Sequence, residues 1–290
     1  MLSFRVHGKW ILAGEHAVLR GGEALVFPVQ SRFLDFSYTS SDQDLTLKII
    51  HPNKDLEKAF WGVLNRALEL VQVPIDEIRG QLHLESQIPI GAGMGASATL
   101  CVALARWFHN LGYLGETDMY SFAKSLEDLF HGESSGVDVA VALSHKPLVF
   151  KRPDQMQTFV PQWQPHFYLS YCGEKGVTAD CVAQVQSLFV KDKKSAVSID
   201  EKMKLAVALA KESLMTPELR NQLVESIKMA CSCFESWGLI TPQLKTHMEH
   251  LNDLGALAVK PTGSGGGGFV LSLWDQAPRL EQLNFELIKA

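Results

Sequence analysis

Pro89-Ile-Gly-Ala-Gly-Met-Gly-Ala-Ser-Ala-Thr99 is a glycine-rich stretch that separates two segments of different periodicity. Residues 81–88 alternate polar and apolar side chains, as a half-buried strand does, and residues 100–108 are rich in good helix formers. The stretch is therefore predicted to be a loop between a strand and a helix. Its closely spaced glycines let backbone amides approach a ligand, and the helix start adds free N–H groups and the positive end of a dipole. This combination suits a phosphate group.

The residues of this loop allow three other interpretations to be compared with phosphate binding. A Walker-type loop needs Gly-Lys-Ser/Thr at the helix start, whereas this chain has Gly95-Ala96-Ser97, so that motif is excluded. Gly91, Gly93 and Ala96 fit GxGxxA, but a dinucleotide-binding loop follows a strand that is buried on both faces. The alternating pattern before this loop disfavours that interpretation. A glycine-rich turn without a ligand stays open for the loop considered by itself.

Length and composition indicate a protein of about two domains with a sizeable core, since 46% of the 290 residues are hydrophobic. The formal net charge is only -5, so no basic surface suggests nucleic acid or an anionic membrane as a partner. No signal peptide or membrane-spanning run is recognisable. We therefore expect a cytoplasmic protein. The five cysteines, an odd number without CxxC spacing, are expected to be buried free thiols.

The order of predicted elements indicates an α+β protein with two domains. Residues 4–50 are expected to form short strands, and residues 55–71 an amphipathic helix. Further helices are expected at residues 96–111, 118–130, 178–190, 198–211, 217–237 and 242–254. A proline- and glutamine-rich segment at residues 153–165 is the expected boundary between a domain at 1–160 and a domain at 161–290.

Four consecutive glycines, Gly265 to Gly268, lead directly into the apolar strand expected at residues 269–274. Four successive glycines are costly to order, so their presence needs a reason. A flexible linker is one interpretation. We favour a backbone nest, or a close approach to another loop or to a ligand, because the run is short and enters a strand at once.

Three motifs in this order resemble those of the GHMP kinase family: Lys9 with Gly14-Glu-His-Ala-Val18, PxGxGxGxSA at residues 89–98, and KxTGxGGGG at residues 260–268. Within the family they are most similar to the mevalonate kinases, because Glu127 is followed by His131-Gly-Glu-Ser-Ser-Gly-Val-Asp138. The ordered set is far more specific than any one motif. The resemblance implies an N-terminal ribosomal-protein-S5-like α/β domain and a C-terminal ferredoxin-like α+β domain, with a cleft between them.

The implied activity is ATP-dependent phosphorylation of the 5-hydroxyl of mevalonate to 5-phosphomevalonate, a step of isoprenoid precursor synthesis. The resemblance implies ATP and Mg²⁺ as cofactors and a monomer or homodimer. Two alternatives stay open. The acceptor could be phosphomevalonate, homoserine or a sugar, or the chain could be a non-catalytic ATP-binding paralogue. The presence of Lys9, Ser97, Glu127 and Asp138 together disfavours the second.

The resemblance also implies roles for residues on the nucleotide side. The loop would bind ATP and hold its phosphates by backbone amides, and its ATP-binding residues would be Pro89, which itself has no N–H to donate, Gly91, Ala92, Gly93, Met94, Gly95, Ala96 and Ser97. Ser97 would offer its hydroxyl to Mg²⁺ and Glu127 its carboxylate, since Mg²⁺ takes few protein oxygens. The last motif would close over the loop through Gly263, Ser264, Gly265, Gly266 and Gly267.

On the acceptor side, the family pattern implies that Asp138 is the base or orienting group at the substrate hydroxyl. Lys9 would lie beside it and neutralise charge on the transferred phosphoryl group. Glu15 and His16 would line the substrate side, and Thr178 would lie near the substrate at a helix start.

Several of these residues have structural alternatives. Asp138 could be a carboxylate that favours a helix start, and Glu127 could form a surface pair with Lys124. His16 could be an ordinary structural histidine, and Thr178 an N-cap.

Some positions depart from the family pattern. Ala96 stands where the family usually has a second serine, Met94 replaces a leucine, and Ser264 replaces an alanine. The missing hydroxyl at Ala96 puts one phosphate or metal contact in doubt. The chain is also short beside many relatives, and the sequence shows no motif for the adenine pocket.

Overall fold

The computed structural model describes residues 1–51, 53–132, 134–279 and 283–290. The described chain forms two compact units. Unit 1 comprises residues 1–8, 32–90 and 95–145, and unit 2 comprises residues 9–31, 91–94 and 146–290. Both units combine strands and helices, which confirms the predicted α+β class. Since the units interleave along the chain, the division into domains 1–160 and 161–290 stays a prediction.

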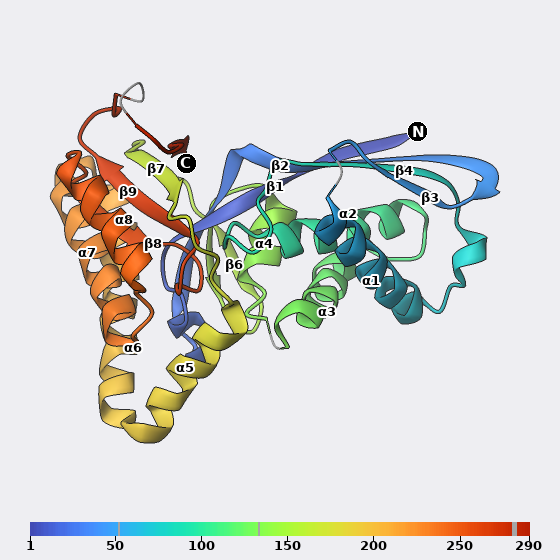
Figure 1. Cartoon of the computed structure of the whole chain (residues 1–290). Helices are drawn as coiled ribbons and strands as arrows, with labels where there is room; N and C mark the ends of the chain where they lie inside the picture. The colour runs from blue at the N-terminus through green and yellow to red at the C-terminus, as the bar shows by residue number, and fades with distance from the viewer. Residues whose placement is uncertain (52, 133, 280–282) are drawn as a thin grey trace. The chain divides into compact units, whose positions relative to one another are not determined.

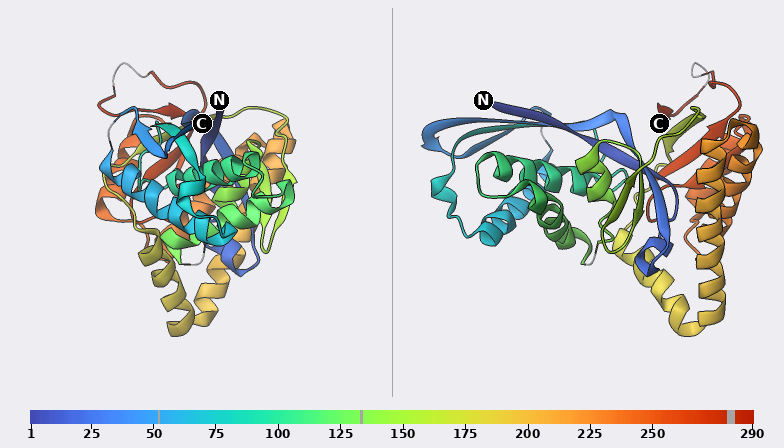
Figure 2. Two further views of the ribbon diagram at one scale, coloured as in Figure 1. Left: turned by 90° about the vertical axis from the view of Figure 1, so that its right-hand side faces the viewer. Right: turned by 180° about the vertical axis from the view of Figure 1, so that it is seen from behind.

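Unit 1 is a sheet with helices packed on one of its faces (Figure 1). The strands are β1 (Leu2–Ala13), β2 (Glu23–Asp44), β3 (Thr46–Ile49) and β4 (Arg79–Ser86). β4 pairs antiparallel with the second half of β2 and parallel with β3. The helices are α1 (Lys54–Val71), α2 (Ala96–Asn110), α3 (Met119–His131) and α4 (Val137–Ser144). Figure 2 shows from behind that α1, α2 and α3 lie on the same face of the sheet.

The core of unit 1 follows from the periodicity of its elements. Leu82 and Leu84 of β4 point to the buried face, as the alternating pattern predicts, and α1 adds Phe60 and Leu64 from one side of the helix. In α2, every residue from 98 to 105 is buried, because this helix is apolar all round. The predicted strand, loop and helix at residues 81–111 are therefore confirmed as β4, the glycine loop and α2.

Unit 2 contains an antiparallel sheet in the order β10-β7-β9-β8. These strands are β7 (His166–Tyr171), β8 (Ala258–Pro261), β9 (Phe269–Trp274) and β10 (Ile288–Lys289). The helices are α5 (Thr178–Lys191), α6 (Lys193–Met215), α7 (Arg220–Ser236) and α8 (Pro242–Asp253). Apolar residues of α7, α8 and the sheet share one core, with Cys231, Leu244 and Val270 among them. The first half of β2 pairs here with β5 (Leu148–Lys151), which pairs with β6 (Gln155–Thr158).

One prediction about the strands was wrong in detail. The region after residue 22 was expected to form several short strands, but β2 is a single strand of 22 residues. Its two halves pair with different partners, β5 in unit 2 and β4 in unit 1. Because pairing on both stretches fixes the extended backbone, the turn-forming residues inside β2 do not interrupt it. No local sequence signal reports such pairing.

Two smaller expectations can be compared with the structure. All five cysteines are free and buried, as predicted. Within the described ranges, no helix is both long enough and apolar enough to cross a membrane.

Candidate active site

The glycine loop adopts a backbone that only glycine accommodates without strain. Gly91, Gly93 and Gly95 have φ angles of 76°, 83° and 79°. Gly95 is the N-cap of α2, so the loop leads directly into the free N–H groups of a helix start. Residues 91–94 belong to unit 2, and the chain enters unit 1 at Gly95. The local geometry is thus that of an anion-binding loop.

Within unit 2, the loop is fixed by backbone contacts from two other motifs. The N–H of Lys9 donates to the carbonyl oxygen of Met94 at 3.0 Å, and the N–H of Phe269 donates to that of Ala92 at 3.3 Å. A Cβ on Gly268 would lie 2.7 Å from the Ala92 oxygen, and one on Gly263 only 3.2 Å from that of Gly93. Glycines therefore allow the loop and the last motif to pack backbone against backbone.

The run from Gly265 to Gly268 is an ordered packing element and not a flexible linker. All four residues have positive φ angles, between 70° and 136°. The N–H of Gly266 donates to Leu239 O at 2.8 Å, and that of Gly268 donates to Glu174 O at 2.7 Å. A Cβ on Gly265 would lie 3.0 Å from the Phe234 ring. The expected close approach to another loop is confirmed, and the linker alternative is wrong.

A buried ion pair joins the first and last motifs inside unit 2. The Nζ of Lys260 lies 2.5 Å from Oε1 of Glu15, and the two side chains are 0% and 2% exposed. Lys260 also donates to Ile11 O at 3.2 Å. Burial raises the pKa of the Glu15 carboxyl, whereas the charges of Lys260 and Lys9 act to lower it. Burial likewise lowers the pKa of Lys260, so each partner of the pair offsets part of the cost of burying the other.

Lys9 completes a small charged cluster with this pair. Lys9 is 3% exposed, and its charge acts on both Glu15 and Lys260. Two lysines and one carboxylate give this trio one net positive charge when all three are ionised. A net positive cluster beside a glycine loop favours an anionic ligand.

The histidine of the first motif is bound to the last motif as well. Nε2 of His16 lies 2.8 Å from the carbonyl oxygen of Ser264, so the neutral ring donates from Nε2. The ring also packs on Trp237, with the centroids 5.1 Å apart. Burial lowers the pKa of His16 to about 4. The ring is therefore neutral at pH 7, and in the structure it is hydrogen-bonded to the last motif. Its predicted role on the substrate side stays a prediction.

His16 leads to a prediction about the pH dependence of stability. Its pKa is lowered from 6.5 to about 4 on folding, so between these pH values the unfolded chain binds the extra proton. The contribution of neutral His16 to the free energy of unfolding is fully present above pH 6.5 and is lost as the pH falls toward 4. The free energy of unfolding, measured with urea, should therefore fall less between pH 6.5 and pH 4 in His16→Asn than in the wild type, by about 1–3 kcal/mol. A His109→Asn variant, in unit 1, serves as the control, and equal declines in both variants would contradict the assignment.

Thr178 begins α5 and does not cap it. The N-cap of α5 is Val177, without a side-chain hydrogen bond to the helix, so the N-cap alternative for Thr178 is wrong. The hydroxyl of Thr178 lies 3.3 Å from that of Ser264. Ser264 of the last motif therefore connects to both Thr178 and His16 through polar contacts.

The remaining predicted residues belong to unit 1. Ser97 is in the first turn of α2, and Glu127 is in α3 with only 2% of its surface exposed. Lys124 pairs with Asp128 at 3.5 Å, and a side chain as buried as Glu127 cannot form a surface pair, which disfavours that alternative. Burial raises the pKa of Cys101 in α2, and the charge of Glu127 raises it further.

Asp138 is the second residue of α4 and follows Gly136, whose φ is 80°. A Cβ on Gly136 would collide with the hydroxyl of Tyr120. The tight turn therefore needs glycine, and it starts α4 so that Asp138 lies in its first turn and is half-buried. Both the catalytic role and the helix-start role agree with this position. Of the preceding motif, Glu133 lies outside the described residues.

The residues also fit a magnesium ion by the chemistry of their donors. Within the described ranges, no three His, Cys, Asp or Glu side chains gather into a metal site. Mg²⁺ does not need such a group, because it keeps waters and substrate phosphates as ligands beside one or two carboxylates. Ser97 and Glu127 supply one hydroxyl and one carboxylate within the same unit.

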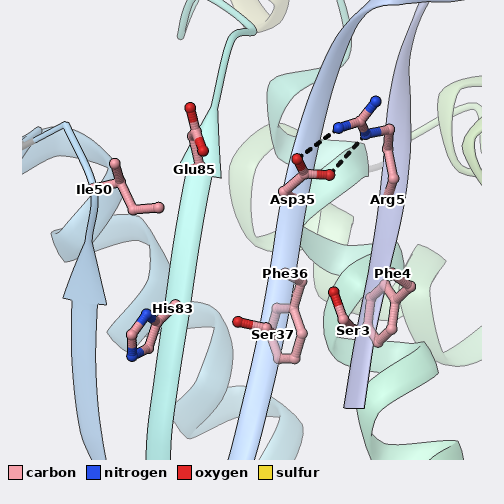
Figure 3. A pocket seen from close by; sticks show the side chains of 9 residues that line it. All are labelled: Ser3, Phe4, Arg5, Asp35, Phe36, Ser37, Ile50, His83 and Glu85. Atoms are coloured by element: carbon pink, nitrogen blue, oxygen red, sulfur yellow. Dashed lines mark hydrogen bonds and ion pairs between the residues drawn. The ribbon is translucent and has the colours of Figure 1, made fainter. Parts of the chain in front are cut away.

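A depression lies on the sheet of unit 1, and Figure 3 shows the side chains around it. Arg5 donates to both oxygens of Asp35 at 2.7 Å and stacks over Phe33. The cation is thus already neutralised by a neighbour. No residue predicted from the motifs lines this depression. The candidate active site is therefore the glycine loop and not this surface.

Some features around the loop follow from no local motif. Lys260 stands in the last motif, but a lysine within the apolar strand β8 also signals a buried charge with a partner. Lys175 lies outside the three motifs, and its position beside Gly91 is visible only in three dimensions. The partner of Arg20, which is Asp200 at 2.5 Å, lies 180 residues away in the chain.

Comparison with known proteins confirms the resemblance. Residues 58–146 match the family model described as GHMP kinases N terminal domain. The mevalonate kinase of Archaeoglobus fulgidus is 29% identical over 273 residues, which cover 92% of this chain and 90% of that protein. The mevalonate kinase of Pyrococcus abyssi is 26% identical over 290 residues, which cover 91% and 86%.

Solved structures share the fold. The crystal structure of L. major mevalonate kinase in complex with R-mevalonate matches with a TM-score of 0.81 at 20% identity, over 95% of this chain and 88% of that chain. That of Methanococcus jannaschii mevalonate kinase matches with a TM-score of 0.78 at 17% identity, over 99% and 96%. In sequence and fold, the chain resembles the two-domain α+β kinases of the GHMP superfamily. Within that superfamily it is mevalonate kinase-like.

The fold does not by itself determine the acceptor. Streptococcus pneumoniae phosphomevalonate kinase, solved in complex with phosphomevalonate and AMPPNP, matches with a TM-score of 0.73 at 18% identity, over 96% of this chain and 93% of that chain. The acceptor of this chain therefore has to be argued from its relatives and tested directly.

Proposed function

We propose that this protein transfers the γ-phosphoryl group of ATP to the 5-hydroxyl of mevalonate, giving 5-phosphomevalonate and ADP. The observation that carries the proposal is the assembly around the glycine loop: Lys9 and the last motif both bind its backbone. The family comparisons favour mevalonate as the acceptor. The two relatives named above are mevalonate kinases, and this chain matches them over most of their length.

Each part of the reaction has a candidate in the chain. Backbone amides from Gly91 to Ser97 would bind the phosphates, and Lys9 would neutralise charge on the oxygens of the transferred group. Asp138 would accept the proton of the substrate hydroxyl. At the same time the hydroxyl oxygen would bond to the γ-phosphorus, and the bond from that phosphorus to ADP would break. Ser97 and Glu127 would hold Mg²⁺, which supplies positive charge to the phosphates.

Glu15 and His16 take a supporting part in this proposal. Their side chains bind Lys260 and Ser264, so they hold the last motif against the loop. Glu15 would keep the lysines near the transferred group in place. We also keep a cytoplasmic location, and a monomer or homodimer, as part of the proposal.

The acceptor is tested by measuring ADP release in separate reactions with mevalonate, phosphomevalonate, homoserine and galactose. The proposal expects release that depends on mevalonate and is near background with the other three. Release with a different acceptor alone would replace mevalonate by that acceptor. No release with any acceptor, in a protein that still binds ATP, would favour the non-catalytic alternative.

The magnesium assignment gives a second prediction. Ser97→Ala removes one oxygen ligand and Glu127→Gln removes the negative charge of another, so each should raise the Mg²⁺ concentration that gives half-maximal activity, by about 10-fold or more for the carboxylate. A magnesium titration of the steady-state rate measures this change. The matched control is Glu116→Gln, an exposed carboxylate near the start of α3. Unchanged metal dependence in Ser97→Ala and Glu127→Gln would remove both residues from the metal site.

A further inference from the structure

We propose that Lys175 is a second phosphate-binding cation, which binds the polyphosphate of the nucleotide at the start of the glycine loop. The proposal rests on the proposed function in one respect, that the loop binds a nucleotide. It assigns a role to a residue outside the three motifs.

The backbone around Lys175 is fixed against the glycine run. Lys175 lies between β7 and α5, and the N–H of Cys172 donates to Gly268 O at 3.0 Å. A Cβ on Gly267 would lie 2.9 Å from the carbonyl carbon of Lys175, and one on Gly176 would collide with Gly265 O. Neighbours on both sides of Lys175 are thus in backbone contact with the last motif. The backbone position of Lys175 is therefore fixed relative to the last motif.

The side chain of Lys175 lies along the first glycine of the loop. A Cβ built on Gly91 would be 3.4 Å from Cδ of Lys175 and 4.0 Å from its Cγ. The aliphatic stem therefore covers Gly91, and the ammonium group is two bonds beyond Cδ. Long charged side chains commonly bury the stem in this way while the charged end stays accessible. Because Cδ lies this close to Gly91, the ammonium group is within reach of the edge of the glycine loop.

The charges nearby leave this ammonium available for a ligand. Glu174, the adjacent carboxylate in the chain, accepts a hydrogen bond from the hydroxyl of Thr241 at 2.8 Å. Across the described part of the chain, no carboxylate forms an ion pair with Lys175. A cation without a protein partner, beside backbone amides, gives an anion a further charge-assisted hydrogen bond.

Two lysines then lie at the two ends of the loop segment that unit 2 contains. Lys9 binds Met94 at one end through its N–H, and Lys175 covers Gly91 at the other. Lys9 is buried with Glu15 and Lys260, whereas Lys175 is exposed. We assign Lys9 to the transferred group and Lys175 to binding of the phosphate chain before transfer. A contact that is equally strong before transfer and in the transition state affects KM for ATP more than kcat.

The test is calorimetric binding of ADP, β,γ-imido-ATP and adenosine to the wild-type protein and its variants. Lys175→Met keeps the length of the stem without the charge and should weaken binding of both phosphate-bearing ligands by about 10-fold. Adenosine binding should not change. Lys175→Arg should stay within about 3-fold of wild type, because it keeps the cation. Lys228→Met, at an exposed lysine of α7, is the matched control.

Steady-state kinetics separate this proposal from its alternatives. Lys175→Met should raise KM for ATP about 10-fold with kcat changed less than about 2-fold. Equal ADP affinity in wild type and Lys175→Met would overturn the proposal. So would a loss of adenosine affinity in Lys175→Met as large as its loss of ADP affinity. A rise in KM for mevalonate alone would assign the lysine to the acceptor carboxylate instead. If the wild type binds nucleotides but turns over no acceptor, the proposed function fails while the binding test of Lys175 stands.

Discussion

Asp138→Asn is expected to lower kcat by about 10²- to 10⁴-fold, the usual contribution of a general acid–base group. Asparagine keeps the shape of the side chain and its place in the first turn of α4 but cannot accept the hydroxyl proton at neutral pH. The affinity for ATP should change by less than about 3-fold, because the residue is assigned to the acceptor. Rapid-quench turnover and nucleotide binding measure the two effects separately.

A matched variant distinguishes catalysis from helix stabilisation. Asp55→Asn also removes a carboxylate from the first turn of a helix, here α1, at an exposed position. If Asp138 served only the helix dipole, both variants would lose about 0.3–1 kcal/mol of stability and keep their turnover. An Asp138→Asn variant with wild-type kcat would remove Asp138 from the role of base.

Lys260→Met should give a large loss of stability, about 3–5 kcal/mol, because it leaves the Glu15 carboxylate buried without its counter-charge. The whole stability of a domain is about 5–15 kcal/mol, so the single variant can fail to accumulate. The double variant Lys260→Met with Glu15→Gln removes both charges and should recover a large part of the loss. The midpoint of urea unfolding measures each variant.

The control for this prediction is an exposed ion pair in the same unit. Lys211 lies 2.7 Å from Glu23, with the two side chains 32% and 40% exposed. Lys211→Met should change the free energy of unfolding by less than about 1 kcal/mol. Equal losses at Lys211 and Lys260, or a double variant that is no more stable than Lys260→Met, would contradict the account of the buried pair.

Local patterns in the sequence were sufficient for much of the fold. Alternation in β4 and the apolar character of α2 predicted the strand and helix on either side of the glycine loop. α1 was predicted from one apolar face, and the structure adds its N-cap, Asn53, whose side chain accepts from two backbone N–H groups. These features depend on neighbours within a few turns, which is why periodicity reports them.

The contacts that complete the site depend on residues far apart in the chain. Lys260 and Glu15 are separated by 245 positions, and no local pattern pairs them. The side chain of Lys175 reaches Gly91 only because the loop before α5 packs on the glycine run. The glycine run itself predicted a close approach, but its partner at Ala92 came from the structure. The roles of Asp138, Glu127 and Lys9 came from the family pattern and stay predictions.

The most direct test of the central claim is the identity of the product. Purified protein with ATP, Mg²⁺ and mevalonate should give ADP and one new phosphomonoester signal in a ³¹P spectrum, coupled to the two protons on C5 of mevalonate. The coupling identifies the 5-oxygen as the acceptor, and omission of mevalonate should abolish the signal. A monoester at another oxygen would contradict the account. So would ADP that accumulates together with inorganic phosphate while mevalonate stays unchanged.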